Sequence, residues 1–272
     1  MKRMITIAIL VAALSYLGIC TLLFFAQDSM IFLRQPLRAE SSALAARLGA
    51  EEFNLATQDG VQLHGWSRKA RTPGTAPWLI YFGGNAEEVT GMLEDLSRYA
   101  GIGVVLANYR GYGLSGGEPS ERVFLADGIA LYDALAARPD VDRERIIVMG
   151  RSLGTGTATY VASQRKARAV VLLSPYDSLT AVAARIYPWL PVPLLMRHPF
   201  DSLSRAPSIS SPMLAVAGTL DTIVPPSHSQ RLHAAWKGEA HLHLLEGADH
   251  NDLLQHPGFW SKVDEFIERH AR

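Results

Sequence analysis

The chain has little cysteine and no excess of charge of either sign, and both features exclude some classes of protein. Cys20 is the only cysteine among 272 residues, so no disulfide within the chain and no cysteine-based metal cluster can form. Acidic and basic residues balance at 26 each, which leaves no basic excess to draw the chain to nucleic acid. Repeats and low-complexity tracts are also missing. With 48% apolar residues, the chain can build the core of one large domain or two small ones.

One long uncharged run is present near the start of the chain. Residues 4–26 carry no charge and are rich in Ile, Leu, Val and Phe, and about 20 such residues cross a bilayer. A cleaved signal peptide is the alternative, but its apolar region covers only about 7–15 residues and ends at a small-residue site. The bulky Ile19 before Cys20 disfavours a lipoprotein. We therefore predict an uncleaved transmembrane anchor over residues 1–27.

The body alternates apolar strands with helices. After a connector over residues 28–52, two alternating runs around Asp59-Gly60 predict a β-hairpin. Strands that are apolar throughout then alternate with helices, which predicts a mostly parallel sheet covered on both faces within one domain, residues 53–272. The predicted strands cover 78–82, 104–108, 145–149, 169–173, 213–217 and 241–245, and the predicted helices cover 86–99, 120–137, 153–164, 227–236 and 257–270. Because this body has its own sheet and helices, we expect it to act without residues 1–26.

One stretch interrupts the alternation. Residues 176–211 hold five prolines together with Tyr187, Trp189 and Phe200. We interpret this stretch as a small insertion that lies over the active site.

The pentapeptide Gly150-Arg151-Ser152-Leu153-Gly154 matches the Gly-x-Ser-x-Gly nucleophile elbow. An apolar strand precedes it and a helix of small residues follows it, which is the context that places a serine on a sharp strand-to-helix turn. A tight turn without chemistry is the alternative. We predict that Ser152 is a nucleophile.

A nucleophilic serine needs a base, and the base needs an orienting carboxylate. In folds with this elbow the chain order is Ser, then Asp or Glu, then His. Asp221 and His250 each follow an apolar strand, so both are predicted at the carboxyl edge of the sheet, where catalysis belongs. Asp249 and Asp252 are too close to His250 in sequence to lie behind its ring, and we expect them to structure its loop.

Two other patterns suggest ligands only weakly. His241 and His243 share a strand face but lack a third ligand, so we predict no metal and no cofactor. Residues 111–116 match Gly-x-Gly-x-x-Gly, but a dinucleotide fingerprint opens directly into a helix and residues 117–119 intervene here. We interpret that segment as a tight loop beside the oxyanion region.

Glycines end the strand before the first predicted helix, in Tyr81-Phe82-Gly83-Gly84-Asn85. Gly83 and Gly84 allow backbone N–H groups to turn toward a developing oxyanion. The N–H of the residue after the nucleophile, Leu153, is the predicted second donor. Alternatively, or in addition, Asn85 caps the helix.

Six motifs occur in an order that resembles the membrane-anchored α/β hydrolases. They are Phe82-Gly83-Gly84-Asn85-Ala86, Asn108-Tyr109-Arg110-Gly111-Tyr112-Gly113, Gly150-Arg151-Ser152-Leu153-Gly154, Ser174-Pro175-Tyr176-Asp177-Ser178-Leu179, Gly218-Thr219-Leu220-Asp221 with Val224-Pro225, and His250-Asn251-Asp252. That group includes bacterial proteins of unknown substrate and eukaryotic protein depalmitoylases. It overlaps with serine aminopeptidase and monoacylglycerol-lipase type hydrolases. The resemblance covers residues 53–270 and implies an α/β-hydrolase fold with the triad Ser152, Asp221 and His250.

The resemblance has one departure. The family usually has His-Gly-Asn where this chain has Gly83-Gly84-Asn85, and the loss of that histidine, which is not a triad member, loosens the strand end. By position, Asn85 would supply the first oxyanion N–H. The resemblance and the anchor together suggest a single-pass protein of a bacterial inner membrane. The charges around the run, with Lys2 and Arg3 before it, favour an extracytoplasmic body.

We therefore expect a serine hydrolase that cleaves a carboxylic ester or thioester of a small or lipid-like acyl substrate through acyl-Ser152. One alternative is a serine aminopeptidase-like peptidase, which needs a carboxylate to hold a substrate amine. The other is a catalytically silent, membrane-bound binding protein, and the intact triad argues against it. No residue pattern specifies an oligomeric state.

Overall fold

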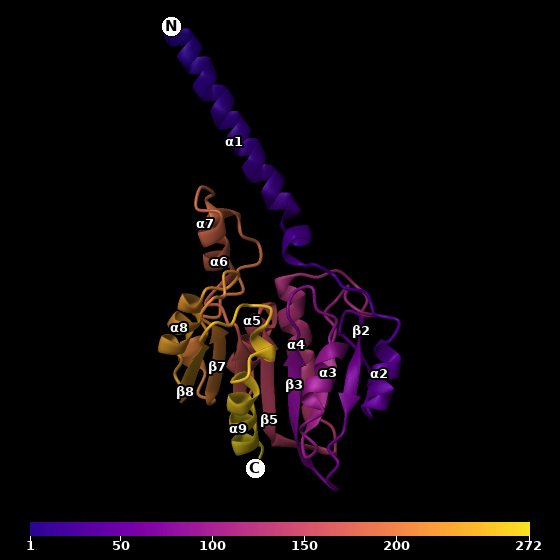
Figure 1. Cartoon of the computed structure of the whole chain (residues 1–272). Coiled ribbons are helices and arrows are strands. Elements are labelled where there is room, and N and C mark those ends of the chain that lie inside the picture. The colour runs from indigo at the N-terminus through magenta and orange to yellow at the C-terminus, as the bar shows by residue number, and fades with distance from the viewer.

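A mostly parallel sheet forms the framework, as predicted. The structure, a computed structural model, describes residues 1–272. Its eight strands lie in the order β1-β2-β4-β3-β5-β6-β7-β8 (Figure 1). β1 pairs antiparallel with β2, and β2 antiparallel with β4, whereas all other neighbours are parallel. The strands are β1 Glu51–Ala56, β2 Gln62–Arg68, β3 Ala76–Phe82, β4 Gly103–Ala107, β5 Val141–Arg151, β6 Ala169–Leu173, β7 Met213–Gly218 and β8 Ala240–Leu245.

Helices cover both faces of the sheet, and each face has its own core. Strand β3 is buried along its whole length, and its alternate side chains enter different cores. Trp78 and Ile80 pack with α4, α5 and α8, whereas Leu79 and Tyr81 pack with α2, α3 and α9. The helices are α1 Lys2–Ile31, α2 Ser41–Arg47, α3 Thr90–Leu96, α4 Glu121–Ala136, α5 Leu153–Gln164, α6 Leu179–Ile186, α7 Val192–Leu195, α8 Pro226–Ala235 and α9 Phe259–Ala271, with single 3₁₀ turns at Ala206–Ser208 and Leu253–Gln255.

The sequence patterns predicted the ends of most helices and strands, but not the start of β5, which begins at Val141 rather than at residue 145, nor the start of one helix. The predicted cap of α4 is present, since Ser120 Oγ accepts the N–H of Val123 at 3.4 Å. The helix predicted from residue 86 begins only at Thr90. Ala86 adopts φ 54°, a left-handed conformation that interrupts a helix, and the carboxylate of Glu88 accepts the N–H of Thr90 at 3.2 Å.

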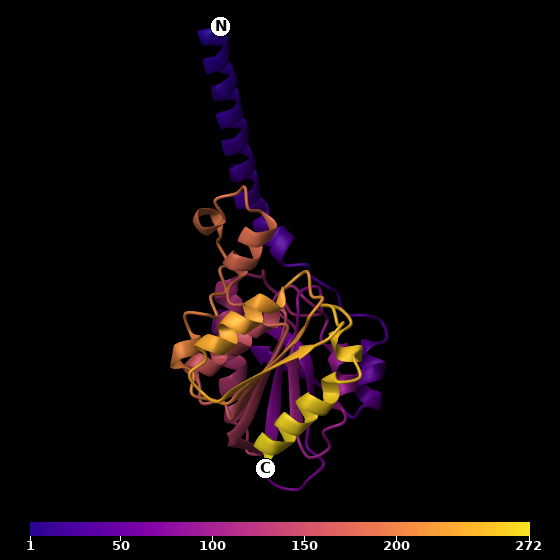
Figure 2. The ribbon, with the colours of Figure 1, turned by 60° about the vertical axis from the view of Figure 1, so that its left-hand side comes forward.

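Helix α1 is longer than the predicted anchor and ends at Ile31 rather than at residue 27. Its 30 residues extend about 45 Å. It is the one helix that is long and apolar enough to cross a membrane by length and composition. Helices α6 and α7, within the insertion at residues 176–211, rise from the carboxyl edge of the sheet on the same side as α1 (Figures 1 and 2).

A buried arginine ties the first hairpin to the helical layer. The guanidinium of Arg110, which follows β4, contacts both carboxylate oxygens of Asp127 on α4 at 2.7 Å. It also contacts Asp59 in the β1–β2 turn at 2.6 and 3.0 Å. The hydrogen bonds that Arg110 donates to both carboxylates raise its pKa, so the guanidinium stays charged and these two carboxylates compensate the buried charge.

This arrangement predicts the effect of Asp127→Asn on stability. The amide keeps the shape but leaves the buried guanidinium with one carboxylate, so we expect the free energy of unfolding to fall by about 2–3 kcal/mol. The matched control is Asp133→Asn on the same helix, whose pair with Arg165 is largely exposed. That change should cost less than about 1 kcal/mol. Urea unfolding of the full chain in detergent measures both, and equal losses would contradict the assigned role of Asp127.

Candidate active site

Ser152 lies on a strained turn between β5 and α5. Its φ of 47° and ψ of −116° are rarely adopted by L-residues. The turn requires the two flanking glycines, because added side chains would meet backbone. A Cβ at Gly150 would lie 2.4 Å from the carbonyl oxygen of Gly154, and a Cβ at Gly154 would lie 2.2 Å from that of Phe82. The close packing of these backbones positions the serine hydroxyl at the carboxyl edge of the sheet.

The structure brings Ser152, Asp221 and His250 together, although 98 residues separate the first from the last. His250 Nε2 lies 2.9 Å from Ser152 Oγ, and His250 Nδ1 lies 2.7 Å from Asp221 Oδ2. The other oxygen of Asp221 accepts the N–H groups of Ile223 at 3.0 Å and Val224 at 2.7 Å. A carboxylate held in this way keeps the proton of the ring on Nδ1, which leaves Nε2 able to accept the serine proton.

The neighbouring carboxylates hold the His250 loop, as their spacing suggested. Asp249 Oδ1 accepts the N–H groups of Asn251 at 2.6 Å and Asp252 at 3.0 Å. Asp252 Oδ1 in turn accepts the N–H of Asp249 at 2.7 Å. Hydrogen bonds from the two loop N–H groups lower the pKa of Asp249, so it stays ionised as a loop-closing acceptor.

Two backbone N–H groups beside Ser152 bond no acceptor within the chain. They belong to Asn85 and Leu153, and both residues line the same cavity as Ser152. Gly84 lies directly against Ser152, since a Cβ on it would be 3.6 Å from Ser152 Cβ. The Gly83 carbonyl accepts the hydroxyl of Tyr109 at 3.0 Å, which holds the strand end in place.

The side chain of Asn85 has a different role from the helix cap that its position suggested. Helix α3 starts five residues later, and Asn85 makes no capping bond to it. Instead, its Oδ1 accepts the N–H of Leu33 at 2.9 Å, the N–H of Ala86 at 3.0 Å and the hydroxyl of Tyr112 at 3.0 Å. The residue therefore connects the segment just after α1 to the strand end beside Ser152.

Glu87 supports this strand end and was not predicted from the sequence. Its Oε2 accepts the N–H of Gly84 at 2.7 Å and lies 3.4 Å from Arg151 Nη1, while its Oε1 accepts the hydroxyl of Tyr81 at 2.8 Å. Burial raises the pKa of Tyr81 well above its ordinary value, so this hydroxyl remains a donor. The available signal was a carboxylate three residues after a glycine, the spacing at which a side chain reaches back to a backbone N–H.

A second buried His–Asp contact lies away from Ser152. Asp177, which follows β6, lies 2.7 Å from His228 Nδ1 and 2.6 Å from Arg231 Nε on α8. Burial alone would raise the pKa of Asp177, but the hydrogen bonds from His228, Arg231 and the N–H of Ser178 outweigh it and lower the pKa to about 2. This cluster attaches α8 to the end of β6.

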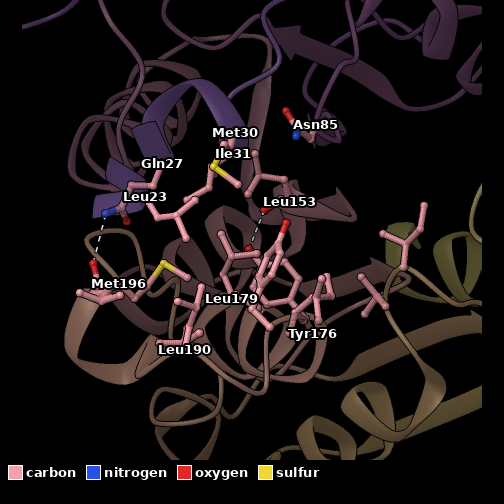
Figure 3. A pocket seen from close by; sticks show the side chains of 18 of the residues that line it. Leu23, Gln27, Met30, Ile31, Asn85, Leu153, Tyr176, Leu179, Leu190 and Met196 are labelled. Carbon is pink, nitrogen blue, oxygen red and sulfur yellow. Dashed lines mark hydrogen bonds between the residues drawn. The ribbon is translucent and has the colours of Figure 1, made fainter. Parts of the chain in front are cut away.

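An apolar cavity of about 330 Å³ opens beside Ser152 (Figure 3). Sixteen of its 19 lining residues are hydrophobic, and its size lies at the lower end of the range of about 300–1,000 Å³ for ligand pockets. Residues of α6, α7 and the segment between them form one wall. The other wall comes from α1 and consists of Leu23, Gln27, Met30 and Ile31. The sequence predicted the insertion over the site but not the contribution of α1.

Comparisons with known proteins identify relatives of the chain. A family model described as alpha/beta hydrolase fold matches residues 82–197, and one described as serine hydrolase (FSH1) matches residues 145–251. An uncharacterized protein of Mycobacterium tuberculosis (strain ATCC 25618 / H37Rv) is 36% identical over 89% of this chain and 86% of that protein. An uncharacterized membrane protein of Saccharomyces cerevisiae is 28% identical over 80% of this chain and 79% of that protein.

A solved structure shows the same fold. An esterase of Pyrococcus furiosus superposes with a TM-score of 0.67 at 21% identity, covering 88% of this chain and 97% of that one. Together with the family models, this likeness confirms the predicted fold, a mostly parallel sheet between helical layers.

The elbow geometry predicts the outcome of Gly154→Ala. Because the added methyl would lie 2.2 Å from a backbone oxygen, we expect β3 and α5 to separate and the chain to lose both stability and the Ser152 conformation. Gly91→Ala is the matched control, since this glycine lies inside α3 with open space around it. That change should stabilise the chain by up to about 1 kcal/mol. Thermal unfolding compares the two, and a Gly154→Ala protein as stable as wild type would contradict this packing.

Proposed function

The chain belongs to the α/β-hydrolase superfamily, and from that premise we propose that it hydrolyses a carboxylic ester or thioester through an acyl-Ser152 intermediate. The observation that carries the proposal is the hydrogen-bonded series from Ser152 through His250 to Asp221, with distances of 2.9 and 2.7 Å, in which Ser152 lines an apolar cavity. The matching serine hydrolase family model supports the same reaction class.

The proposed reaction proceeds in two halves. His250 Nε2 takes the hydroxyl proton as Ser152 Oγ attacks the carbonyl carbon, and Asp221 stabilises the resulting imidazolium. The oxyanion accepts the N–H groups of Asn85 and Leu153, and one such donor is typically worth about 10²–10³ in rate. The intermediate collapses as the alcohol or thiol leaves with the proton from His250. Water then attacks the acyl-enzyme by the same route and releases the carboxylic acid.

The lining of the cavity favours an acyl substrate over an aminoacyl one. Its three polar lining residues are Gln27, Asn85 and Ser152, and none of the 19 is acidic. A peptidase that holds a substrate amine needs a carboxylate there, whereas a hydrocarbon chain needs only apolar walls. A silent binding protein would have no use for the aligned proton path. We further propose that α1 holds the enzyme in a membrane, which the name of the yeast relative supports.

The first test is covalent labelling. We expect a fluorophosphonate to label the protein at Ser152 alone, because only this hydroxyl has a base at 2.9 Å and unbonded N–H groups beside it. Ser152→Ala should abolish labelling. Ser174→Ala is the control, since Ser174 also ends a central strand with a positive φ. If the Ser152→Ala protein is labelled as strongly as wild type, the assignment is wrong. A screen of esters, thioesters and aminoacyl amides then identifies the leaving group.

The second test separates two aspartates near His250. Asp221→Asn should leave the fold intact and lower turnover by about 10⁴, because an amide favours the wrong tautomer of the ring. Asp249→Asn should have a far smaller effect, since Asp249 bonds only loop N–H groups. Steady-state turnover of a labelled ester, with circular dichroism to check folding, measures both. Equal losses would deprive Asp221 of its orienting role.

A further inference from the structure

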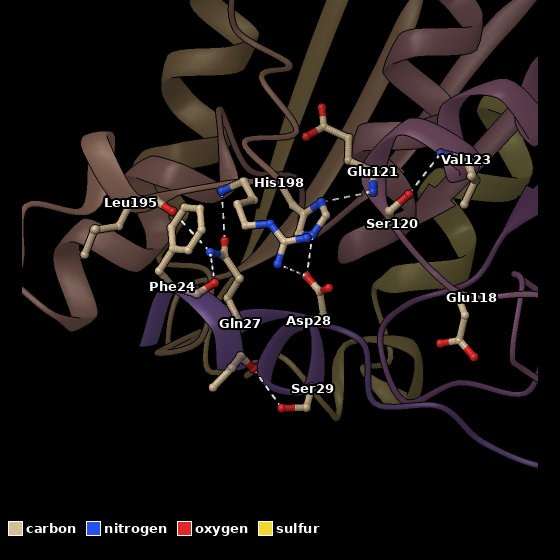
Figure 4. Close-up of polar contacts among 12 residues, drawn as sticks. Phe24, Gln27, Asp28, Ser29, Glu118, Ser120, Glu121, Val123, Leu195 and His198 are labelled. Carbon is tan, nitrogen blue, oxygen red and sulfur yellow. Dashed lines mark hydrogen bonds and ion pairs between the residues drawn. The ribbon is translucent and has the colours of Figure 1, made fainter. Parts of the chain in front are cut away.

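Helix α1 is attached to the insertion by polar contacts that its apolar sequence does not suggest (Figure 4). We call residues 179–197, which include α6 and α7, the lid. The side chain of Gln27 is buried, its Nε2 donates to the carbonyl of Leu195 at 3.1 Å, and its Oε1 accepts the N–H of Arg197 at 2.8 Å. An amide that satisfies two backbone groups of another segment orients the two segments as well as joining them.

A second contact lies one residue further along α1. Asp28 Oδ1 lies 2.7 Å from His198 Nε2 and 3.2 Å from Arg197 Nη1. His198 is buried, and its Nδ1 accepts the N–H of Glu121 at 3.3 Å. The ring proton is therefore on Nε2 and is donated to Asp28. These bonds connect α1 and the end of the lid to α4 in the body.

One face of α1 forms a wall of the cavity beside Ser152. Its lining residues are separated by four, three and one positions, which places them on a single helical stripe. They are Leu23, Gln27, Met30 and Ile31. The stripe extends along about 12 Å of the helix, at about 1.5 Å per residue. Leu179, Leu190 and Met196 of the lid line the cavity opposite it (Figure 3).

The tip of the lid is apolar and largely uncovered. Residues 186–194, which we call the lid tip, contain no charged residue and include three prolines, which have no backbone N–H to satisfy. Ile186 is 53% exposed, Trp189 55% and Leu194 84%. Arg185 and Arg197 flank the tip. Apolar residues and a tryptophan between two arginines are typical of a segment that inserts into a bilayer while its charged flanks stay near the headgroups.

The position of the lid tip relative to α1 determines how deep in the bilayer the tip lies. A span of about 20 residues from Met4 ends near Leu23, so Tyr16 would lie about 10 Å inside the hydrocarbon. The Tyr16 hydroxyl donates to the carbonyl of Trp189 at 2.9 Å, so the lid tip reaches the same depth as Tyr16. In hydrocarbon no water could satisfy that carbonyl, and this hydroxyl does so instead.

We infer that α1 is a substrate-binding element as well as an anchor, and that the lid tip inserts beside it into the same leaflet. The stripe on α1 and the lid together form an acyl groove that opens into the bilayer and ends at Ser152. The occupant is the long hydrocarbon chain of a membrane-resident ester or thioester, which reaches the serine without passing through water. This inference rests on the proposed function for the reaction, but not for the insertion of the lid.

The role of the α1 stripe as a wall of the groove is tested by measuring how full-length protein discriminates between substrates of different acyl-chain length. Leu23→Trp fills the groove far from Ser152, so it should lower kcat/KM for p-nitrophenyl palmitate by about tenfold to a hundredfold. Hydrolysis of p-nitrophenyl acetate should be affected much less, so the readout is a fall in the ratio of palmitate to acetate hydrolysis. The matched control is Leu22→Trp, because Leu22 is 67% exposed and does not line the cavity. Equal effects of the two variants on the palmitate-to-acetate ratio would overturn the role of α1.

Two further arms separate the possible outcomes. Palmitoyl glycerol and a palmitoyl-cysteine peptide, each presented in phosphatidylglycerol-containing vesicles, distinguish a lipid source of the chain from an acylated protein.

Insertion of the lid tip is measured without catalysis by a nitroxide at Leu194→Cys in a Cys20→Ser background, with Lys262→Cys on α9 as control. We expect oxygen to reach the label at position 194 more readily than a water-soluble nickel relaxant, and the reverse at position 262. A label at 194 as water-accessible as that at 262 would refute the insertion. If the protein shows no turnover and no fluorophosphonate labelling while the nitroxide at position 194 is shielded from water, the proposed function is refuted but the insertion is not.

Discussion

The arrangement of the site depends on one close approach of backbones, in which the first turn of α5 lies against the end of β3. The distance is short enough that no side chain fits at Gly154, and it forces Ser152 into a conformation that a free residue would avoid. Strain of this kind persists only where the surroundings determine the geometry. Here β5 lies between β3 and β6 and is parallel to both, and the cores on both faces bury its residues 146–150.

The buried carboxylates of the site already have their hydrogen-bond partners, so the proposed reaction does not require them to move. Asp221 is fully buried, yet each of its oxygens has a donor, two from the loop that carries it and one from His250. An uncompensated carboxylate in that position would be costly, so the same hydrogen bonds that stabilise the folded loop also hold Asp221 in place against the His250 ring. Glu87 has a comparable function at the opposite side, where it bonds the N–H of Gly84 and holds the strand end beside Ser152.

Because α1 is attached to the lid, this N-terminal helix is more than a tether. A tether would need no polar contacts with the body, whereas Gln27 and Asp28 bond segments 168 to 170 residues away. The C-terminal part of α1 therefore belongs to the same packed unit as the lid. The expectation that the body acts without residues 1–26 stays a prediction, because Gln27 and Asp28 lie just beyond that segment and Leu23 is its one residue in the cavity wall.

Local patterns in the sequence were sufficient for the order of strands and helices, the elbow at Ser152, and the placing of Asp221 and His250 at one edge of the sheet. These features depend on residue spacing, on the burial of whole strands and on a chain order shared by this fold, all of which are readable along the chain. Three features were decided only by the tertiary structure: the bonding of Asn85 to Leu33, the support of Gly84 by Glu87, and the wall that α1 contributes to the cavity. Asn85 resembles a helix cap, and α1 resembles a plain anchor, because a side chain's local pattern does not reveal a partner far along the chain. Which partner it meets is determined by how the sheet, the lid and α1 pack together.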